Sequence, residues 1–177
     1  RVLETAADMM EDRVWLLAAT LVQEVGKSFI EAYAGVAEAI DFLRWDAQLA
    51  RAKYAQELPS TPSFAGDYNK RVLVPHGVFM TADPFNFQVA IGTDQMAKAL
   101  VMGNSVIASP SDKSSLSGRL VYQIFDDALA AEGVPNQGIV NFAPGGPDMK
   151  RALLAQEGVT GLCFTGSSAA LDDIITT

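Results

Sequence analysis

The sequence contains a single cysteine, Cys163, and a single histidine, His76, and each scarcity argues against a class of site. One cysteine cannot form a disulfide within the chain, and it fits a reducing compartment. A zinc site built on cysteine and histidine ligands is not expected, because the chain has only one residue of each kind. A Ser-His-Asp hydrolase would have to use His76, which lies in a Pro-His-Gly turn, so that class is disfavoured too.

Positive charge and long apolar runs are also scarce. The chain has 13 lysines and arginines against 21 acidic residues, and its net charge of −8 argues against binding to a nucleic-acid backbone. No apolar run reaches the roughly 18 residues that span a bilayer, and no signal-peptide pattern follows Arg1. We therefore expect no nucleic-acid or membrane partner and a cytoplasmic location, or the mitochondrial matrix in a eukaryote.

The composition is that of a globular chain, with 49% hydrophobic and 19% charged residues. In the first third, apolar residues recur at the 3.6-residue period, which predicts amphipathic helices over residues 11–25 and 31–53. The first stripe comprises Val14, Leu17, Ala18, Leu21 and Val25, and the second comprises Val36, Ile40, Leu43, Ala47 and Ala50. Gly26 supplies a stop between the helices, and we expect the two stripes to face one another.

Residues 57–70 form the best candidate boundary, because no period runs through them. The residues that interrupt it are Pro59, Ser60, Thr61, Pro62, Ser63 and Gly66. We therefore predict an N-terminal helical segment (residues 1–56), a connector (57–70) and a second domain (71–177). A regular helix through the connector would refute this division.

After the connector, short apolar runs alternate with helical patterns. The runs cover residues 71–74, 77–82, 105–108, 138–143 and 159–165, and the helical patterns cover 87–102, 115–131, 148–156 and a segment that starts near 167. Strands that alternate with helices form βαβ units, and continuous apolar strands are typical of a sheet buried on both faces. We predict an α/β fold in which N-terminal helices precede a Rossmann-like parallel sheet with helices on both faces.

Four strands end in distinctive loops, at the edge where open parallel sheets bind their ligands. The loops are Asp83-Pro84-Phe85-Asn86-Phe87, Ser109-Pro110-Ser111-Asp112, Pro144-Gly145-Gly146-Pro147 and Phe164-Thr165-Gly166-Ser167. Each precedes a helix, whose N-terminus can bind an anion. Taken singly, each is explained by the needs of a turn and a helix cap. No GxGxxG motif is present, so a standard dinucleotide loop is not indicated.

Taken together in order and spacing, these loops resemble the aldehyde dehydrogenase superfamily. The usual family forms are Pro-Trp-Asn-Phe, a Gly-Asn-x-Val strand, Lys-Pro-Ser-Glu or Lys-Pro-Ser-Asp, and Phe-Thr-Gly-Ser. The strand form is matched by Gly103-Asn104-Ser105-Val106, and Glu24-Val25-Gly26-Lys27 resembles a family Glu-x-Gly-Lys. The resemblance covers nearly the whole chain, and it implies that residues 71–177 are a partial dinucleotide-binding domain.

The variant Pro-Phe-Asn-Phe is similar to the pyrroline-5-carboxylate dehydrogenases, the branch that oxidises glutamate semialdehyde in proline degradation. Asp112, Leu171 and the segment at residues 37–44 point the same way. The resemblance implies an NAD- or NADP-dependent oxidation of a small aldehyde. It also implies a homo-oligomer for the complete protein.

The resemblance further implies roles for residues at the strand ends. The amide of Asn86 would hold the oxyanion formed when the family's cysteine attacks the aldehyde, although asparagine is also a good helix N-cap. Gly166 and Ser167 would meet the pyrophosphate, and Asp112 would accept from a ribose hydroxyl. The remaining expected cofactor contacts are Asp83, Pro84, Phe85, Ser109, Ser111, Gly145, Gly146 and Thr165.

Two residues depart from the family pattern. Ser109 stands where the family usually has a lysine that contacts the adenosine ribose, and Asp83 occupies a position that is commonly neutral. A carboxylate near a pyrophosphate is unfavourable, so we expect weak NAD binding. Lys113 is a possible source of the missing charge, but we do not assign it that role.

Cys163 is not expected to be the nucleophile, because it lies in an apolar run before Phe-Thr-Gly-Ser, whereas the family's cysteine and general-base glutamate follow that motif. A buried cysteine that packs as a small hydrophobe is the better interpretation. We therefore expect an incomplete chain that is inactive alone. The alternative is a non-catalytic module that retains the dinucleotide-binding fold.

Overall fold

The computed structural model describes residues 1–54, 58–60 and 64–175. Three helices come first: α1 (Val2–Asp12), α2 (Val14–Val25) and α3 (Phe29–Leu49), which runs into the π-helical turn η1 (Ala50–Tyr54). Gly26 ends α2 in the left-handed conformation, with φ of 72°. Ser28 and Glu31 then start α3 with a reciprocal capping box. The two predicted helices are present and pack together, with their predicted apolar stripes buried or partly buried.

Helix α1 was not predicted, and Arg13 separates it from α2, so α2 begins later than the expected residue 11. Its buried face carries Leu3, Ala6, Ala7 and Met10, which are spaced for a helix.

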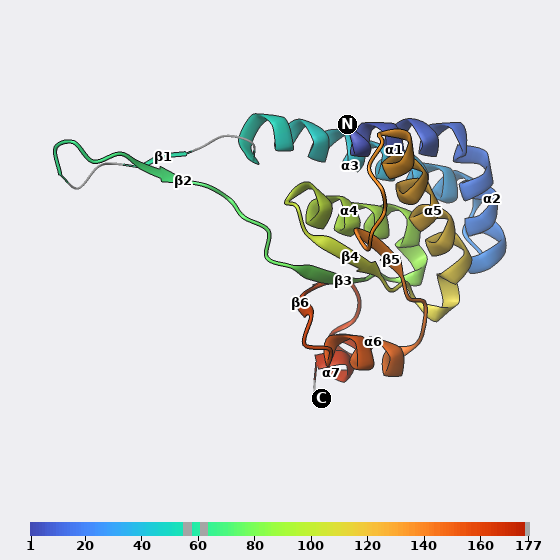
Figure 1. The fold of residues 1–177 in the computed structure, drawn as a ribbon. Helices are drawn as coiled ribbons and strands as arrows, with labels where there is room; N and C mark the ends of the chain where they lie inside the picture. Colours follow the sequence, from blue (N-terminus) through green and yellow to red (C-terminus); the bar gives the residue numbers. More distant parts are fainter. Residues whose placement is uncertain (55–57, 61–63, 176–177) are drawn as a thin grey trace.

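Part of the predicted connector is a β-hairpin. Strands β1 (Leu58–Ser60) and β2 (Asn69–Arg71) pair antiparallel and extend away from the rest of the chain (Figure 1). No helix occurs at residues 58–60 or 64–70. The predicted apolar run at residues 71–74 is not a strand beyond Arg71, and its side chains Val72, Leu73 and Val74 are exposed.

Four parallel strands form the predicted sheet: β3 (Val78–Ala82), β4 (Ser105–Ala108), β5 (Val140–Phe142) and β6 (Val159–Phe164), in the order β5-β4-β3-β6. The helices that follow them are α4 (Gln88–Val101), α5 (Ser115–Ala131), α6 (Pro147–Leu154) and α7 (Ser168–Ile175). Short 3₁₀ turns, η2 (Phe85–Phe87) and η3 (Asp112–Ser114), precede α4 and α5. The α/β fold predicted from the sequence is confirmed.

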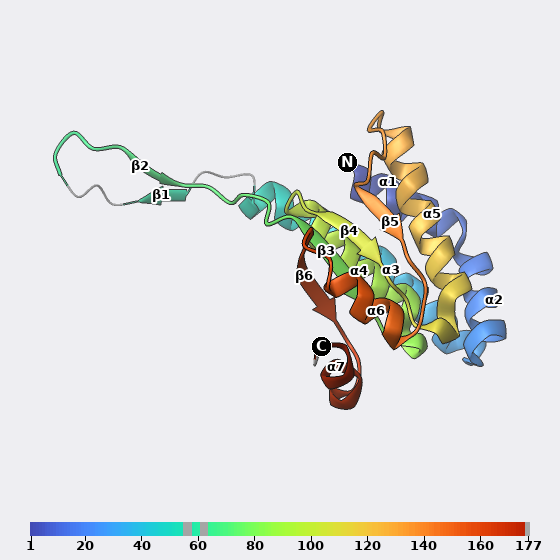
Figure 2. The same ribbon diagram turned by 60° about the horizontal axis from the view of Figure 1, so that its bottom comes forward.

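The strand order reverses at β3. The chain steps from β3 to β4 to β5 in one direction and then crosses back over the sheet to β6. Because such crossovers are right-handed, α4 and α5 lie on one face, whereas α6 lies on the other (Figure 1); in Figure 2 the face with α6 is turned toward the reader. Neighbouring strands β3 and β6 therefore send their chains to opposite faces, which opens a crevice between their carboxyl ends.

Helices α1 to α3 pack outside α4 and α5, so that one hydrophobic core joins the N-terminal helices to the sheet. Its largest fully buried side chains include Leu17 of α2, Leu43 of α3, Met96 of α4 and Phe125 of α5. The division into a helical segment and a dinucleotide-binding domain stays a prediction. Within the described part of the chain, no helix has the length and apolar character needed to cross a membrane.

Candidate functional site

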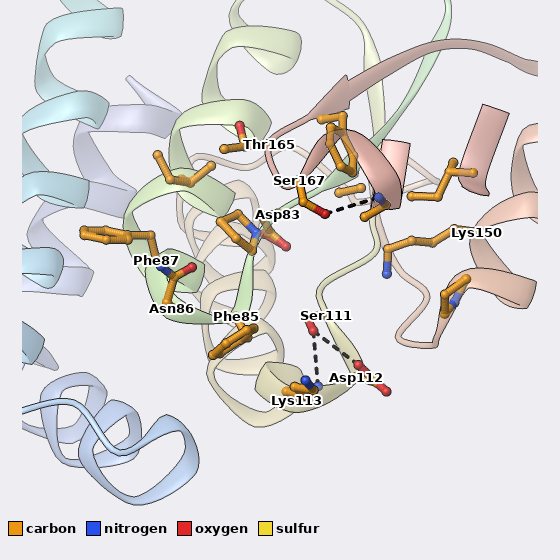
Figure 3. A pocket seen from close by; sticks show the side chains of 18 of the residues that line it. Asp83, Phe85, Asn86, Phe87, Ser111, Asp112, Lys113, Lys150, Thr165 and Ser167 are labelled. Atoms are coloured by element: carbon orange, nitrogen blue, oxygen red, sulfur yellow. Dashed lines mark hydrogen bonds between the residues drawn. The ribbon is translucent and has the colours of Figure 1, made fainter. Parts of the chain in front are cut away.

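A cavity of about 820 Å³ opens at the carboxyl ends of the strands, where the strand order reverses. Its walls come from the loops after β3, β4, β5 and β6 (Figure 3). Small-molecule sites usually have volumes of this order. The fold therefore brings together four loops that are far apart in the sequence.

All of the site residues predicted from the sequence line this cavity except Ser109. Those that do are Asp83, Pro84, Phe85, Asn86, Ser111, Asp112, Gly145, Gly146, Thr165, Gly166 and Ser167. Ser109 is completely buried instead, because its backbone N–H continues the ladder to the Thr81 carbonyl (3.0 Å). Its hydroxyl has no hydrogen-bond partner among the described residues.

The loop after β3 presents Asn86 at the cavity wall. Asn86 lies in the middle of η2 and is exposed, whereas the N-cap position of α4 is Phe87 and has no side-chain capping bond. The cap interpretation of Asn86 is therefore wrong for this chain. Lys27 holds the loop from the N-terminal helices: its Nζ donates to the Asn86 carbonyl (2.8 Å) and lies 4.0 Å from the centre of the Phe87 ring.

Asp83 is buried at the base of this loop, with 7% of its surface exposed. Its Oδ2 accepts from Nε2 of Gln88 (2.9 Å), while Oδ1 has no partner among the described residues. Gly92 of α4 makes room for the carboxylate, since a Cβ there would lie 2.3 Å from Oδ2. Burial raises the pKa of Asp83 to about 7, against smaller lowering effects from Gln88 and Lys150.

Lys150 is a site residue that the sequence did not reveal. It projects from α6 into the cavity with 7% of its surface exposed. Its Nζ donates to the carbonyls of Pro110 (2.8 Å) and Gly145 (2.9 Å), which follow β4 and β5. The sequence feature that could have indicated this position is its spacing: Lys150 follows Gly146, the N-cap of α6, by four residues. This spacing places both residues on the same face of the helix, next to the Pro-Gly-Gly-Pro loop.

The loops after β4 and β6 both end in serine caps. The Ser111 hydroxyl accepts from the Lys113 N–H (3.3 Å) at the start of η3, and Ser167 Oγ accepts from the Ala170 N–H (3.2 Å) in the first turn of α7. Gly166 lies just before α7, and a Cβ there would lie 2.6 Å from the Phe164 ring. The loop after β6 thus brings the N-terminus of α7, where N–H groups lack helical partners, to the cavity.

Cys163 lies in β6, half-buried and outside the cavity lining. Burial raises the pKa of its thiol, which disfavours the reactive thiolate. Over the described parts of the chain, no cluster of three or more histidine, cysteine and acidic side chains is placed to hold a metal ion.

The model of the aldehyde dehydrogenase family matches residues 1–177. The bifunctional protein PutA of Salmonella typhimurium is 37% identical over 168 residues, which are 94% of this chain and 11% of that protein. The α-ketoglutaric semialdehyde dehydrogenase of Bacillus subtilis is 35% identical over 163 residues, 92% of this chain and 32% of that enzyme.

Among solved structures, the 1-pyrroline-5-carboxylate dehydrogenase from Thermus with bound NAD superimposes with a TM-score of 0.87 at 36% identity. The match covers 98% of this chain and 33% of that one. The chain thus spans 11% of PutA and about a third of the two dehydrogenases.

Proposed function

The chain belongs to the aldehyde dehydrogenase family, and we propose that it forms the dinucleotide-binding part of an NAD-dependent enzyme that oxidises an aldehyde to a carboxylic acid. The observation that carries the proposal is the cavity at the reversal of strand order, where the exposed Asn86 and the start of α7 line one space. Open parallel sheets bind nucleotides at this position.

The cavity residues fit a dinucleotide. Gly166 presents no side chain at the cavity, and a Cβ there would collide with the Phe164 ring. The first turn of α7 offers N–H groups to a pyrophosphate. The carboxylate of Asp112 suits a ribose hydroxyl. A bound NAD would supply the hydride acceptor for the oxidation, and Asp112, Gly166 and the start of α7 would hold the cofactor in place.

Asn86 has a role in the chemistry itself. Attack of a thiolate on the aldehyde turns the carbonyl oxygen into an oxyanion, and a fixed amide N–H stabilises that charge more than it stabilises the neutral carbonyl. The Asn86 side chain is exposed at the cavity wall and is not used as a cap. Its backbone carbonyl accepts from Lys27, which anchors the loop that carries the side chain.

We propose glutamate γ-semialdehyde as the substrate. The proposal is supported by the Pro-Phe-Asn-Phe sequence of the loop after β3 and by the likeness to the Thermus enzyme named 1-pyrroline-5-carboxylate dehydrogenase. The Bacillus subtilis relative is named for another semialdehyde. Comparison of kcat/KM for the two semialdehydes in the complete protein tests the choice, and a preference for α-ketoglutaric semialdehyde would overturn it.

The nucleophile and the general base lie outside these 177 residues in this proposal. We expect the purified chain to show no NAD reduction with glutamate semialdehyde, measured by absorbance at micromolar protein, because Cys163, the one cysteine of the sequence, lies outside the cavity lining. Turnover that disappears in Cys163→Ala would contradict the proposal that the nucleophile lies outside these residues, and it would also contradict the structural role of Cys163.

The alternative function is a non-catalytic module that binds a dinucleotide or a protein partner. Asp83 and Ser109 favour it, because both depart from the family pattern at positions expected to contact the cofactor. Reading the gene beyond residue 177 distinguishes the two functions. A cysteine in a Gly-Gln-x-Cys context supports the enzyme, and its absence supports the module.

A further inference from the structure

The cavity contains a buried ammonium group that the family pattern does not assign. An ammonium has three N–H donors, and the described residues provide acceptors for two of those of Lys150, the carbonyls of Pro110 and Gly145. The side chain extends from α6 toward the space bordered by Asp83, Ser111 and Asp112 (Figure 3). The third N–H is therefore available to a ligand in the cavity.

The position of this ammonium matters because Ser109 supplies no cation at the end of β4, and Lys113, the cation that follows in η3, lies over the Phe85 ring with its Nζ 5.1 Å from the ring centre. Lys150 reaches the loop after β4 from α6, and its Nζ donates to the carbonyl of Pro110, the residue directly after Ser109. Its two carbonyl contacts fix the side chain at the carboxyl ends of β4 and β5. Residue 109 carries no positive charge in this chain, and Lys150 of α6 supplies one to the cavity instead.

The surroundings of Lys150 indicate which ligand group it meets. Burial lowers the pKa of Lys150, while the carboxylates of Asp83 and Asp112 oppose that shift. A further negative group such as a phosphate would be repelled by the carboxylate of Asp112 and, above about pH 7, by that of Asp83. A hydroxyl group suits the position, because its oxygen accepts from the ammonium and its hydrogen donates to a carboxylate.

Helix α6 connects the two ends of the cavity. Lys150 bonds to the loops after β4 and β5, and the next residue, Arg151, bonds to Asp173 of α7. The start of α7 follows β6, whereas the loop after β4 lies two strands away in the sheet. A dinucleotide whose pyrophosphate meets the start of α7 would extend its adenosine ribose toward the loop after β4, where Lys150 bonds to Pro110.

We propose that Lys150 and Asp112 together bind the adenosine ribose diol of NAD, with Lys150 donating to one hydroxyl oxygen and Asp112 accepting from a hydroxyl. The proposal rests on the proposed function, because it takes the cavity to be a dinucleotide site. It makes this pair specificity-determining as well: the 2′-phosphate of NADP would face Asp112, so the site selects NAD.

Calorimetric titration of the 177-residue chain tests the proposal. We expect Lys150→Met to weaken NAD binding roughly 10- to 100-fold, the loss typical of a hydrogen bond to a charged group. Lys98→Met is the matched control, since it removes the same charge from α4 outside the cavity, and we expect the Kd to stay unchanged. Lys150→Gln retains a donor for the two carbonyls, so it keeps the test available if Lys150→Met does not fold.

A second experiment changes the ligand instead of the protein. An NAD analogue whose adenosine carries a 2′,3′-dideoxyribose should bind the unaltered chain more weakly than NAD, and Lys150→Gln should weaken it little further. Equal affinity of the unaltered chain for NAD and the analogue, or for NAD and NADP, would overturn the ribose assignment. NAD binding that both Lys150 variants leave unchanged would overturn the role of Lys150, whereas absence of any NAD binding would overturn the proposed function itself.

Discussion

In the complete enzyme, we expect Asn86→Ala to lower kcat by roughly 10²–10³, the effect of removing one oxyanion-hole donor, while the melting temperature stays nearly unchanged. The side chain is exposed at the cavity wall and caps no helix, so its removal takes away no stabilising contact that the structure shows. Stopped-flow or steady-state kinetics with a saturating aldehyde measures the first effect, and thermal unfolding measures the second.

Asn136→Ala is the matched control for this experiment. The Asn136 side chain donates to Asp126 (2.7 Å) and to the Val140 carbonyl (2.9 Å), and it accepts from the Val140 N–H (3.0 Å). We expect this variant to lose stability, by roughly 1–3 kcal/mol, with kcat of the folded protein retained. The opposite pattern for Asn86, a large fall in melting temperature with kcat intact, would contradict its role in the chemistry.

The second large effect concerns the pH dependence of stability. The pKa of Asp83 rises from 3.8 in the unfolded chain to about 7 in the folded protein, and a difference of this size corresponds to about 4 kcal/mol. Between about pH 4 and pH 7 the folded protein retains a proton that the unfolded chain has lost. Asp83 therefore makes the free energy of unfolding fall as the pH rises through this window, with no further change above it.

Asp83→Asn removes this dependence, because the neutral amide has the shape of the acid and can still accept from Gln88. We expect the variant to gain stability relative to the unaltered chain as pH rises from 4 to 7, by up to about 4 kcal/mol, measured by urea denaturation. Asp46, another acid whose pKa burial raises, is present in both proteins, so its contribution cancels. A stability difference that is constant over the whole range would show that Asp83 ionises normally.

Much of the sheet and its helices could be predicted because the local patterns were unambiguous. The apolar run at residues 105–108 and the helical pattern at residues 115–131 coincide with β4 and α5 to the residue. Both are bounded by polar or turn-forming residues, so local preference and burial lead to the same boundaries. Helix α1 was missed although its apolar spacing was present in Leu3, Ala6, Ala7 and Met10.

The strand order and the orientation of single side chains could not be predicted in this way. Pairing of β6 with β3 depends on a contact between residues about 80 positions apart, which no local pattern specifies. Ser109 turns into the protein because the ladder continues one residue past β4. Lys150 enters the cavity because α6 crosses back over the sheet. The charged groups of the cavity therefore follow from the topology rather than from the motifs.

An NMR titration of the isotopically labelled chain with NAD tests the central claim, that the cavity at the reversal of strand order is a dinucleotide site. We expect saturable shifts of backbone amide signals at Asp83, Gly145, Gly166 and Ser167, which follow three different strands and meet only in this cavity. Signals from the hairpin of β1 and β2 should stay unchanged. Shifts that appear elsewhere, or no shifts at millimolar NAD, would contradict the account.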